Sequence, residues 1–168
     1  CRIDLTQYQV RIAVNFLREL ADKFFDRYQP SKLNAATAHS LNDFNNIIAR
    51  SSWERRFFIW CDSTSSVLSW SSEETVINYI CPTDGKPHRY FVDAKVTIKQ
   101  TDGSVKTFLV EIKPFAQTIP PKPRKNKKTT LMETATWMKN TAKWEYAKKY
   151  CDKYGYEFMI ITEKELGL

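Results

Sequence analysis

Long apolar runs are missing from this 168-residue sequence, and none approaches the about 20 residues that a membrane-spanning helix needs. The lack of such a run predicts no membrane partner. No secretory leader is visible, but the sequence begins at Cys1 without a methionine, which leaves a missing leader open. The four cysteines are scattered and include no CxxC pair, which argues against a zinc site and favours reduced thiols in a cytosolic protein. A motif for stacking on single-stranded RNA is also missing, which makes RNA binding a weak hypothesis.

Positive charge is in excess and unevenly distributed. The net charge is +7 and the sequence pI is about 9.2. Residues 1–45 hold six Lys/Arg against five Asp/Glu, whereas residues 46–168 hold twenty against fourteen. This distribution favours a polyanionic partner for the second segment, and nucleic acid is the commonest one. The length allows one domain with a hydrophobic core and an appended element.

Residues 89–113 are the centre of the predicted fold, because they read as two antiparallel strands joined at Thr101-Asp102-Gly103. On the first strand, alternation places Asp93 on the face opposite to the apolar residues Val92, Ala94, Val96 and Ile98. On the second strand, Glu111 and Lys113 share a face with Leu109, opposite to Phe108, Val110 and Ile112. Two acids and a lysine are therefore candidates to meet on one side of one hairpin.

The length of the hairpin loop decides whether these groups meet. Side chains directly opposite each other on antiparallel strands lie on the same face. A three-residue loop at 101–103 sets Asp93 opposite Glu111, whereas a loop of two or four residues does not. Three-residue loops favour a left-handed glycine at their last position, and Gly103 stands there. We predict this loop. A β-bulge would also place Asp93 and Glu111 on the same face.

Paired carboxylates beside a lysine suit the hydrolysis of a phosphodiester. Mg²⁺ prefers oxygen ligands, activates water and clamps phosphate oxygens. Asp93 and Glu111 offer carboxylates, and the carbonyl of Ile112 lies next to them. Lys113 could orient the water or offset developing negative charge. The alternative is a salt-bridged pair on an exposed sheet, because a bare D…ExK pattern often arises by chance.

Two amphipathic helices are predicted before the hairpin. The first spans residues 4–28, and its apolar stripe either packs on the domain core or docks a protein partner: Leu5, Tyr8, Ile12, Phe16, Leu20 and Phe24. The second spans 53–61 and is capped by Ser51 or Ser52. Its first turn carries Glu54, which either favours the positive end of the helix dipole or serves as a third carboxylate. Two further acids either line a site or are solvated: Glu73 and Glu74.

Residues 114–128 form a proline-rich basic stretch in which four prolines bar a helix. No acid offsets its five positive side chains, Lys122, Arg124, Lys125, Lys127 and Lys128. A solvated charge run is the default interpretation. Its attachment to the acid-bearing strand nevertheless favours contact with phosphate. Two residues before the first strand of the hairpin are further candidates for phosphate contact, His88 and Arg89.

A long helix and a strand are predicted at the end of the sequence. Thr130 and Glu133 form a capping box for a helix that Gly155 closes, and 157–161 predicts an apolar strand that is either central or covered. Counted from a short strand at 46–50, the order β-α-β-β-β-α-β predicts an α/β domain with a mixed β-sheet flanked by helices. We therefore divide the chain into an N-terminal helical extension, 1–45, and a domain at 46–168.

Several segments taken together resemble one nuclease family. They are RSSWE at 50–54, WSSEE at 70–74, PTDGK at 82–86, HRYFVD at 88–93, EIKP at 111–114 and QTIPPK at 117–122, followed by WMKNTAKWEYAKKYC and ITEKEL. The layout resembles the PD-(D/E)xK nuclease superfamily, and more closely the head-completion nucleases of T-even-like tailed phages. The resemblance covers about 46 to 168, and Val92 stands where a proline commonly precedes the aspartate.

This resemblance implies a restriction-endonuclease-like core and a metal-dependent DNA endonuclease. It implies that Asp93 and Glu111 bind metal, that Lys113 is the catalytic lysine, that Glu54 is the helix-borne acid and that Gln117 is a polar site residue. The expected cofactor is Mg²⁺, or Mn²⁺ in its place, and the expected substrate is double-stranded DNA.

The resemblance also implies a place in virion assembly, when packaged DNA is processed before the tail joins. The expected location is the host cytoplasm or the virion, with phage portal or neck proteins as further partners. The alternative is a non-catalytic protein of the head–tail vertex that binds DNA or the portal and uses the acids only architecturally.

Overall fold

The structure is a computed structural model that describes residue 47 and residues 49–167. The helix predicted at 4–28 and the extension at 1–45 lie outside these residues. The described elements are α2 (Ser52–Ser63), β1 (Val67–Ser72), β2 (Val76–Ile80), β3 (Pro87–Phe91), β4 (Ala94–Lys99), β5 (Val105–Ile112), the 3₁₀ turn η1 (Phe115–Gln117), α3 (Lys127–Tyr154) and β6 (Glu157–Ile161). No helix in this part of the chain is both long and apolar enough to cross a membrane.

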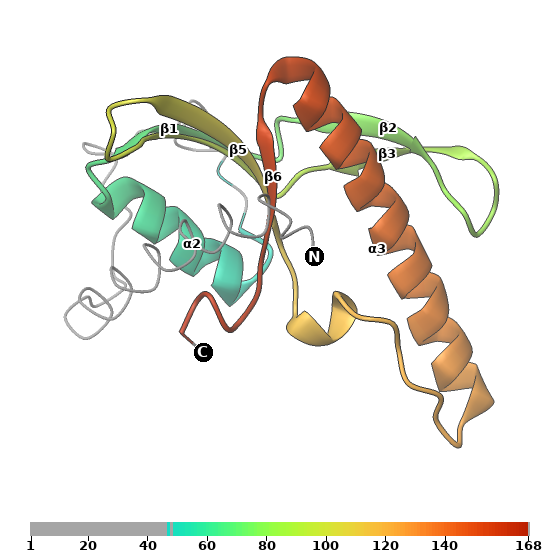
Figure 1. Ribbon diagram of the computed structural model, residues 1–168. Helices are drawn as coiled ribbons and strands as arrows, with labels where there is room; N and C mark the ends of the chain where they lie inside the picture. The colour runs from blue at the N-terminus through green and yellow to red at the C-terminus, as the bar shows by residue number, and fades with distance from the viewer. Residues whose placement is uncertain (1–46, 48, 168) are drawn as a thin grey trace, which may run out of the picture.

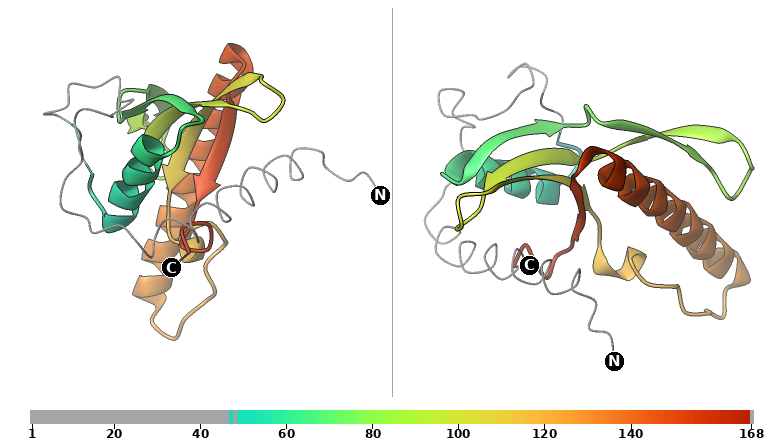
Figure 2. Two further views of the ribbon diagram at one scale, coloured as in Figure 1. Left: turned by 90° about the vertical axis from the view of Figure 1, so that its left-hand side faces the viewer. Right: turned by 45° about the horizontal axis from the view of Figure 1, so that its top comes forward.

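Four strands form a mixed sheet in the order β1-β4-β5-β6. The first three pair antiparallel, whereas β6 runs parallel to β5 after the chain crosses over through α3. Helix α2 covers one face of this sheet, and α3 lies on the other face together with the hairpin of β2 and β3 (Figure 1, Figure 2). The predicted mixed sheet flanked by helices is confirmed.

Alternation along β5 divides the core into two clusters. Phe108 and Val110 pack in one cluster with Phe58 of α2. The position between them, Leu109, packs in the other cluster with Ala147 of α3. The predicted alternation of this strand is therefore confirmed. The active-site candidates of β5 occupy the side of the strand that faces away from α2.

The hairpin between β4 and β5 has the predicted three-residue loop. Ala94 pairs with Val110 and Lys99 with Val105, and the Gln100 amide donates to the carbonyl of Ser104 at 2.7 Å. The last loop residue, at position 103, has φ +83°, in the left-handed region that favours glycine. Extending this register by one position sets Asp93 opposite Glu111, as predicted.

The strand predicted to begin at Arg89 is divided in the structure, so this prediction is wrong. β3 ends at Phe91 and pairs with β2 in a separate two-stranded sheet, and β4 begins at Ala94. Between them the Val92 amide donates to the carbonyl of Thr75 at 3.0 Å, and the Val92 side chain packs on the α3 side rather than with Ala94. Alternation did not reveal this break because both halves are extended. Asp93 lies at the bend between the two strands.

Helix α3 begins at Lys127 instead of near Thr130. The Asn126 side chain is the N-cap and accepts hydrogen bonds from two amides of the first turn, at 3.0 and 3.3 Å. The Thr130 hydroxyl instead accepts from the Arg124 amide at 2.9 Å. Gly155 ends the helix with φ +69°, as predicted. Part of the basic stretch therefore belongs to a helix.

Two further predictions of the strand order are wrong. Five strands rather than three lie between α2 and α3, and the described residues between 46 and 50 form no strand. Strand β6 lies at the edge of the four-stranded sheet and not at its centre, so of the two predicted alternatives it is the covered strand. It is apolar because both of its faces are covered: Met159 packs on the α2 side and Phe158 on the α3 side.

Candidate active site

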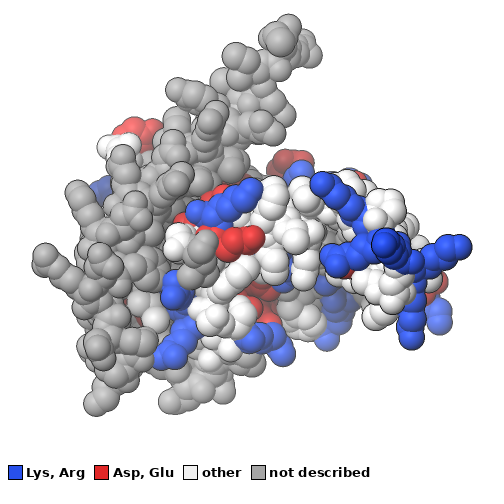
Figure 3. Space-filling model, turned by 90° about the horizontal axis from the view of Figure 1, so that it is seen from below, with Lys and Arg blue, Asp and Glu red and all other residues white. Residues whose placement is uncertain are grey.

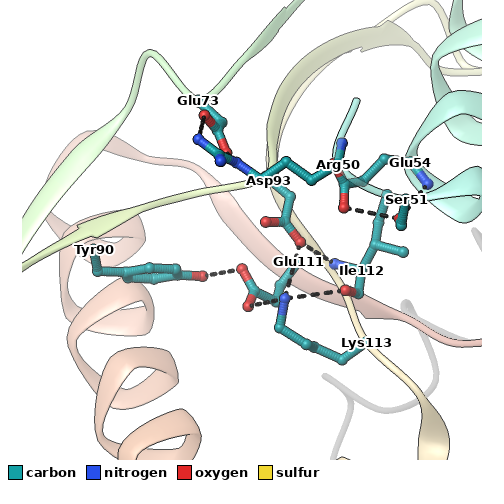
Figure 4. Close-up of polar contacts among 9 residues, drawn as sticks. All are labelled: Arg50, Ser51, Glu54, Glu73, Tyr90, Asp93, Glu111, Ile112 and Lys113. Atoms are coloured by element: carbon teal, nitrogen blue, oxygen red, sulfur yellow. Dashed lines mark hydrogen bonds and ion pairs between the residues drawn. The ribbon is translucent and has the colours of Figure 1, made fainter. Parts of the chain in front are cut away.

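Four of the residues predicted for the site meet where β3 gives way to β4 (Figure 4). Asp93 Oδ2 accepts a hydrogen bond from the Ile112 amide at 2.8 Å and lies 3.4 Å from Lys113 Nζ. The same ammonium lies 3.1 Å from Glu111 Oε1 and donates to the Ile112 carbonyl oxygen at 3.2 Å. Three oxygen atoms from three residues therefore surround one cation.

The two carboxylates of this cluster are poorly solvated, since the side chains of Glu111 and Asp93 are 2% and 14% exposed. Burial, and then the charge of Glu111, raise the pKa of Asp93 to about 6, against the opposing effect of Lys113. For Lys113, burial works to lower the pKa, but the two carboxylates outweigh it and the pKa is raised. The ammonium therefore stays charged and offsets the buried negative charge.

Tyr90 belongs to this cluster, although the sequence analysis did not identify it. Its hydroxyl donates to Glu111 Oε2 at 2.6 Å. Burial and the Glu111 charge raise the pKa of Tyr90, so the phenol stays protonated and remains a donor. A continuous strand from Arg89 would place Tyr90 on the face away from Asp93. The division between β3 and β4 brings both to one site, and alternation alone could not have found this.

Glu54 lies in the first turn of α2, whose N-cap is Ser51. Its carboxylate accepts hydrogen bonds from the Ser51 hydroxyl at 2.8 Å and from the Arg50 amide at 2.7 Å. The Glu54 charge contributes to the raised pKa of Asp93, so the two carboxylates are within electrostatic reach. These contacts are compatible with both interpretations of Glu54. It stabilises the start of the helix, and it lies near the buried acids as a third carboxylate would (Figure 4).

Arg50 and Glu73 form an ion pair at the rim of the site. Arg50 Nε and Nη2 contact the two Glu73 oxygens at 2.6 and 2.9 Å, and Glu73 has φ +54°. The Glu73 amide also reaches the carbonyl of Asp93 at 3.4 Å. Of the two acids left open by the sequence, Glu73 thus borders the site, whereas Glu74 is exposed. The sequence analysis did not single out Arg50.

Three predicted site residues do not join this cluster. Gln117 is exposed on η1, and within the described chain no hydrogen bond links its side chain to the acids. His88 Nε2 lies 2.8 Å from Asp84 Oδ2, and Arg89 lies over the ring of Phe91 at 4.8 Å. These two belong to β3, but to the part of the strand that is remote from Asp93.

The basic stretch is exposed at all five positions predicted to contact nucleic acid: Lys122, Arg124, Lys125, Lys127 and Lys128. Figure 3 shows basic side chains gathered over the part of the molecule that carries this loop and the start of α3, and acidic ones nearer the middle of the same face. Arg124 is partly engaged, since it pairs with Glu133 at 3.0 Å. The four lysines are therefore the more available cations.

A mixed sheet between helices, with two acids and a lysine at one strand end, defines the class of PD-(D/E)xK nucleases. A family model described as "TnsA-like endonuclease N terminal" matches residues 64–163. The "Head completion nuclease" of Enterobacteria phage T4 is 41% identical over 129 residues, which cover 74% of this chain and 83% of that protein. The chain therefore belongs to the TnsA-like endonuclease family, and the phage T4 protein is a relative. No solved structure matches this chain.

Proposed function

We propose that this protein is an endonuclease that hydrolyses phosphodiester bonds in double-stranded DNA with a bound divalent metal ion. Membership of an endonuclease family supports the activity, and the name of the phage T4 relative supports a role in completing phage heads. The observation that carries the proposal is the set of three oxygens around Lys113 Nζ. The functional unit in this proposal is the domain at 46–168.

The donor set fits a hard divalent cation such as Mg²⁺ or Mn²⁺. Asp93, Glu111 and the Ile112 carbonyl supply oxygen atoms only, and such ions prefer oxygen. These oxygens already converge on one cation, the Lys113 ammonium. A buried pair of carboxylates needs such a partner, because two unsolvated negative charges repel each other.

The proposed roles follow from these contacts. Asp93, Glu111 and the Ile112 carbonyl would hold a divalent ion, while the Tyr90 hydroxyl fixes the second oxygen of Glu111. A divalent ion supplies charge relief on the scissile phosphate and activation of the water nucleophile. With an ion on those oxygens, the Lys113 ammonium would be free to orient the water or to offset charge that develops on the phosphate.

Glu54 and Gln117 have proposed roles with different support. Glu54 is the helix-borne acid, and its charge already acts on Asp93. Gln117 is exposed on η1, which follows β5 after two residues. Its role as a polar site residue rests on the resemblance to head-completion nucleases.

The basic stretch is the proposed DNA interface, because its lysines are exposed and follow the acid-bearing strand. His88 and Arg89 are secondary candidates that would contact DNA at a different place. The His88 ring lies against Tyr79, which packs on Tyr146 of α3. Tyr146 is about 28 Å along the helix from Lys127. A duplex that touches both groups would therefore have to extend along α3.

Incubation of linear duplex DNA with Mg²⁺ and the wild-type protein tests the proposal, beside Asp93→Asn and Lys113→Met. We expect cleavage by the wild type and a loss of about 100-fold or more in each variant, with DNA binding retained. Lys106→Met is the matched control, because Lys106 lies on β5, which ends one residue before Lys113, but pairs with Glu157. It should cleave like the wild type.

Two results would reject this site. Equal cleavage by all four proteins would place the chemistry elsewhere. DNA binding without cleavage by the wild type, in Mg²⁺ and in Mn²⁺, would favour the non-catalytic alternative at the head–tail vertex. The proposed location is the host cytoplasm during virion assembly or the virion, with portal or neck proteins as partners.

A further inference from the structure

A second group of metal-ligating side chains lies at the turn between β2 and β3, away from the buried acids. One donor atom each of Cys81, Asp84 and His88 lies within 4.8 Å of the other two. His88 lies near the start of β3, whereas Asp93 follows the end of that strand at Phe91. Figure 1 and Figure 2 show the hairpin extending past α3. This group is therefore separate from the nuclease site.

The ligands differ in exposure in a way that suits a bound ion. Cys81 is 1% exposed, so its thiol lies beneath the turn. The side chains of Asp84 and His88 are 40% and 43% exposed, and their Oδ2 and Nε2 atoms are 2.8 Å apart. An ion held here would be anchored from below and would be reached by solvent from the side of the imidazole and the carboxylate.

The backbone of the turn already positions these groups. The Cys81 amide donates to the carbonyl of Lys86, and the Gly85 amide donates back to the carbonyl of Cys81, both at 2.9 Å. Gly85 has φ +68°, which the tight turn requires. Asp84 Oδ1 accepts from the Lys86 amide at 3.0 Å, which leaves Oδ2 on the side of His88. The backbone of the turn would therefore need little reordering to bind an ion.

We propose that this turn binds a transition-metal ion of the Zn²⁺ type through Cys81 Sγ, Asp84 Oδ2 and His88 Nε2, with water at a fourth position. Thiolate, imidazole and carboxylate are the ligands that Zn²⁺ takes in tetrahedral sites. A thiolate and a carboxylate also neutralise the dication. Mg²⁺ is disfavoured, because it prefers oxygen ligands alone.

The geometry requires a small adjustment. Tetrahedral Zn²⁺ places a sulfur and a nitrogen ligand about 3.5 Å apart. Cys81 Sγ, which lies within 4.8 Å of the other two donor atoms, must therefore come closer to them by up to about an ångström. Asp84 Oδ2 and His88 Nε2, now 2.8 Å apart, must separate by about half an ångström. Rotation of the exposed Asp84 and His88 side chains supplies this movement. Because Cys81 follows β2 and His88 lies in β3, the ion would tie the two strands together at their turn.

Titration of the full chain with Co²⁺ tests the site, because Co²⁺ replaces Zn²⁺ and its bond to a thiolate absorbs in the near ultraviolet. We expect one equivalent of Co²⁺ to give this band and Zn²⁺ to displace it. The band should be lost in Cys81→Ser and kept in Cys151→Ser, which changes another buried thiol. Cys1→Ser should also keep it.

Misfolding could also remove the band in Cys81→Ser, because Cys81 is buried. Two substitutions of exposed ligands separate this explanation from loss of the metal site. His88→Gln and Asp84→Asn should each weaken Co²⁺ binding by about tenfold or more. Asp93→Asn should leave the band unchanged, which separates this site from the nuclease chemistry. The proposal is overturned by the absence of a thiolate band, by a band that persists in Cys81→Ser, or by unchanged affinity in both His88→Gln and Asp84→Asn.

Discussion

Lys113 and the oxygens around it are the residue-scale basis of this account. The register that sets Asp93 opposite Glu111 was predictable, because a three-residue loop fixes which side chains share a face. Tyr90 was not predictable in this way, since its contact with Glu111 depends on a break in the strand. The position of Arg50 at the rim also depends on tertiary structure, because its partner Glu73 is 23 residues away.

Removing the ammonium should strengthen metal binding even though it stops catalysis. In Lys113→Met, no cation competes for the oxygens of Asp93, Glu111 and Ile112. We expect Mn²⁺ affinity measured by calorimetry to rise by roughly tenfold, which corresponds to about 1.4 kcal/mol. Lys106→Met should bind Mn²⁺ like the wild type. Weaker binding by Lys113→Met would mean that the lysine is needed to form the metal site.

The titration of Asp93 should be visible in the stability of the metal-free protein. Burial and the charge of Glu111 raise its pKa to about 6, so the folded state holds this proton more tightly than the unfolded chain does. The free energy of unfolding should therefore fall as the pH rises from about 4 to about 6, by on the order of 2 kcal/mol. Urea unfolding across this range measures the effect.

The Asp93→Asn variant should lack this part of the pH dependence, and Asp102→Asn, at the exposed hairpin loop, should keep it. Added Mg²⁺ should reverse the trend, because the ion binds the deprotonated carboxylate and competes with the proton. A pH profile that is the same in the wild type and Asp93→Asn would contradict the raised pKa.

Tyr90→Phe should impair the site without removing any proposed metal ligand. It deletes the hydroxyl that donates to Glu111 Oε2 at 2.6 Å and leaves that buried oxygen without this partner. We expect a loss of about 10- to 100-fold in metal affinity or cleavage, and a loss of about 1.5–3 kcal/mol in the free energy of unfolding. Tyr146→Phe, on α3, is the matched control. Wild-type metal affinity in Tyr90→Phe would show that the hydroxyl does not position Glu111.

At the scale of elements, periodicity predicted the existence of the helices and strands better than their ends. The helix at 53–61 and the strand at 157–161 are present, because their apolar patterns match the faces they bury. The start of α3 was misplaced, because Thr130 and Glu133 satisfy a capping pattern but bond to Arg124 instead. Which of two possible caps is used depends on the path of the preceding loop.

Neutralising the basic stretch should reduce the salt dependence of DNA binding. Substituting Gln for Lys122, Lys125, Lys127 and Lys128 should lower the slope of log affinity against log salt by about one unit per lost phosphate contact. Arg124→Gln should change the slope less, because Arg124 pairs with Glu133. Fluorescence anisotropy with a duplex at several salt concentrations measures this slope.

The control for that measurement lies on the same helix. Lys148 and Lys149 are exposed on α3, about 30 Å from its first turn. Replacing both with Gln removes positive charge from the helix without changing the loop. If this pair lowers the slope as much per charge as the four lysines do, the basic stretch is not the DNA interface.

At the scale of the whole molecule, the fold class and the nuclease family were predictable from the sequence. The separate two-stranded sheet of β2 and β3 was not, because alternation does not record which strands pair. This hairpin provides both Tyr90 and the Cys81–Asp84–His88 group, so it contributes to two sites. The part of the molecule that was hardest to predict is therefore also chemically important.

The anomalous density of Mn²⁺ in crystals of the protein is the most direct test of the central claim. We predict one Mn²⁺ bound by Asp93, Glu111 and the Ile112 carbonyl oxygen, with Lys113 Nζ displaced from those three atoms. An ion bound elsewhere, or Lys113 unmoved among the oxygens at saturating Mn²⁺, would contradict it.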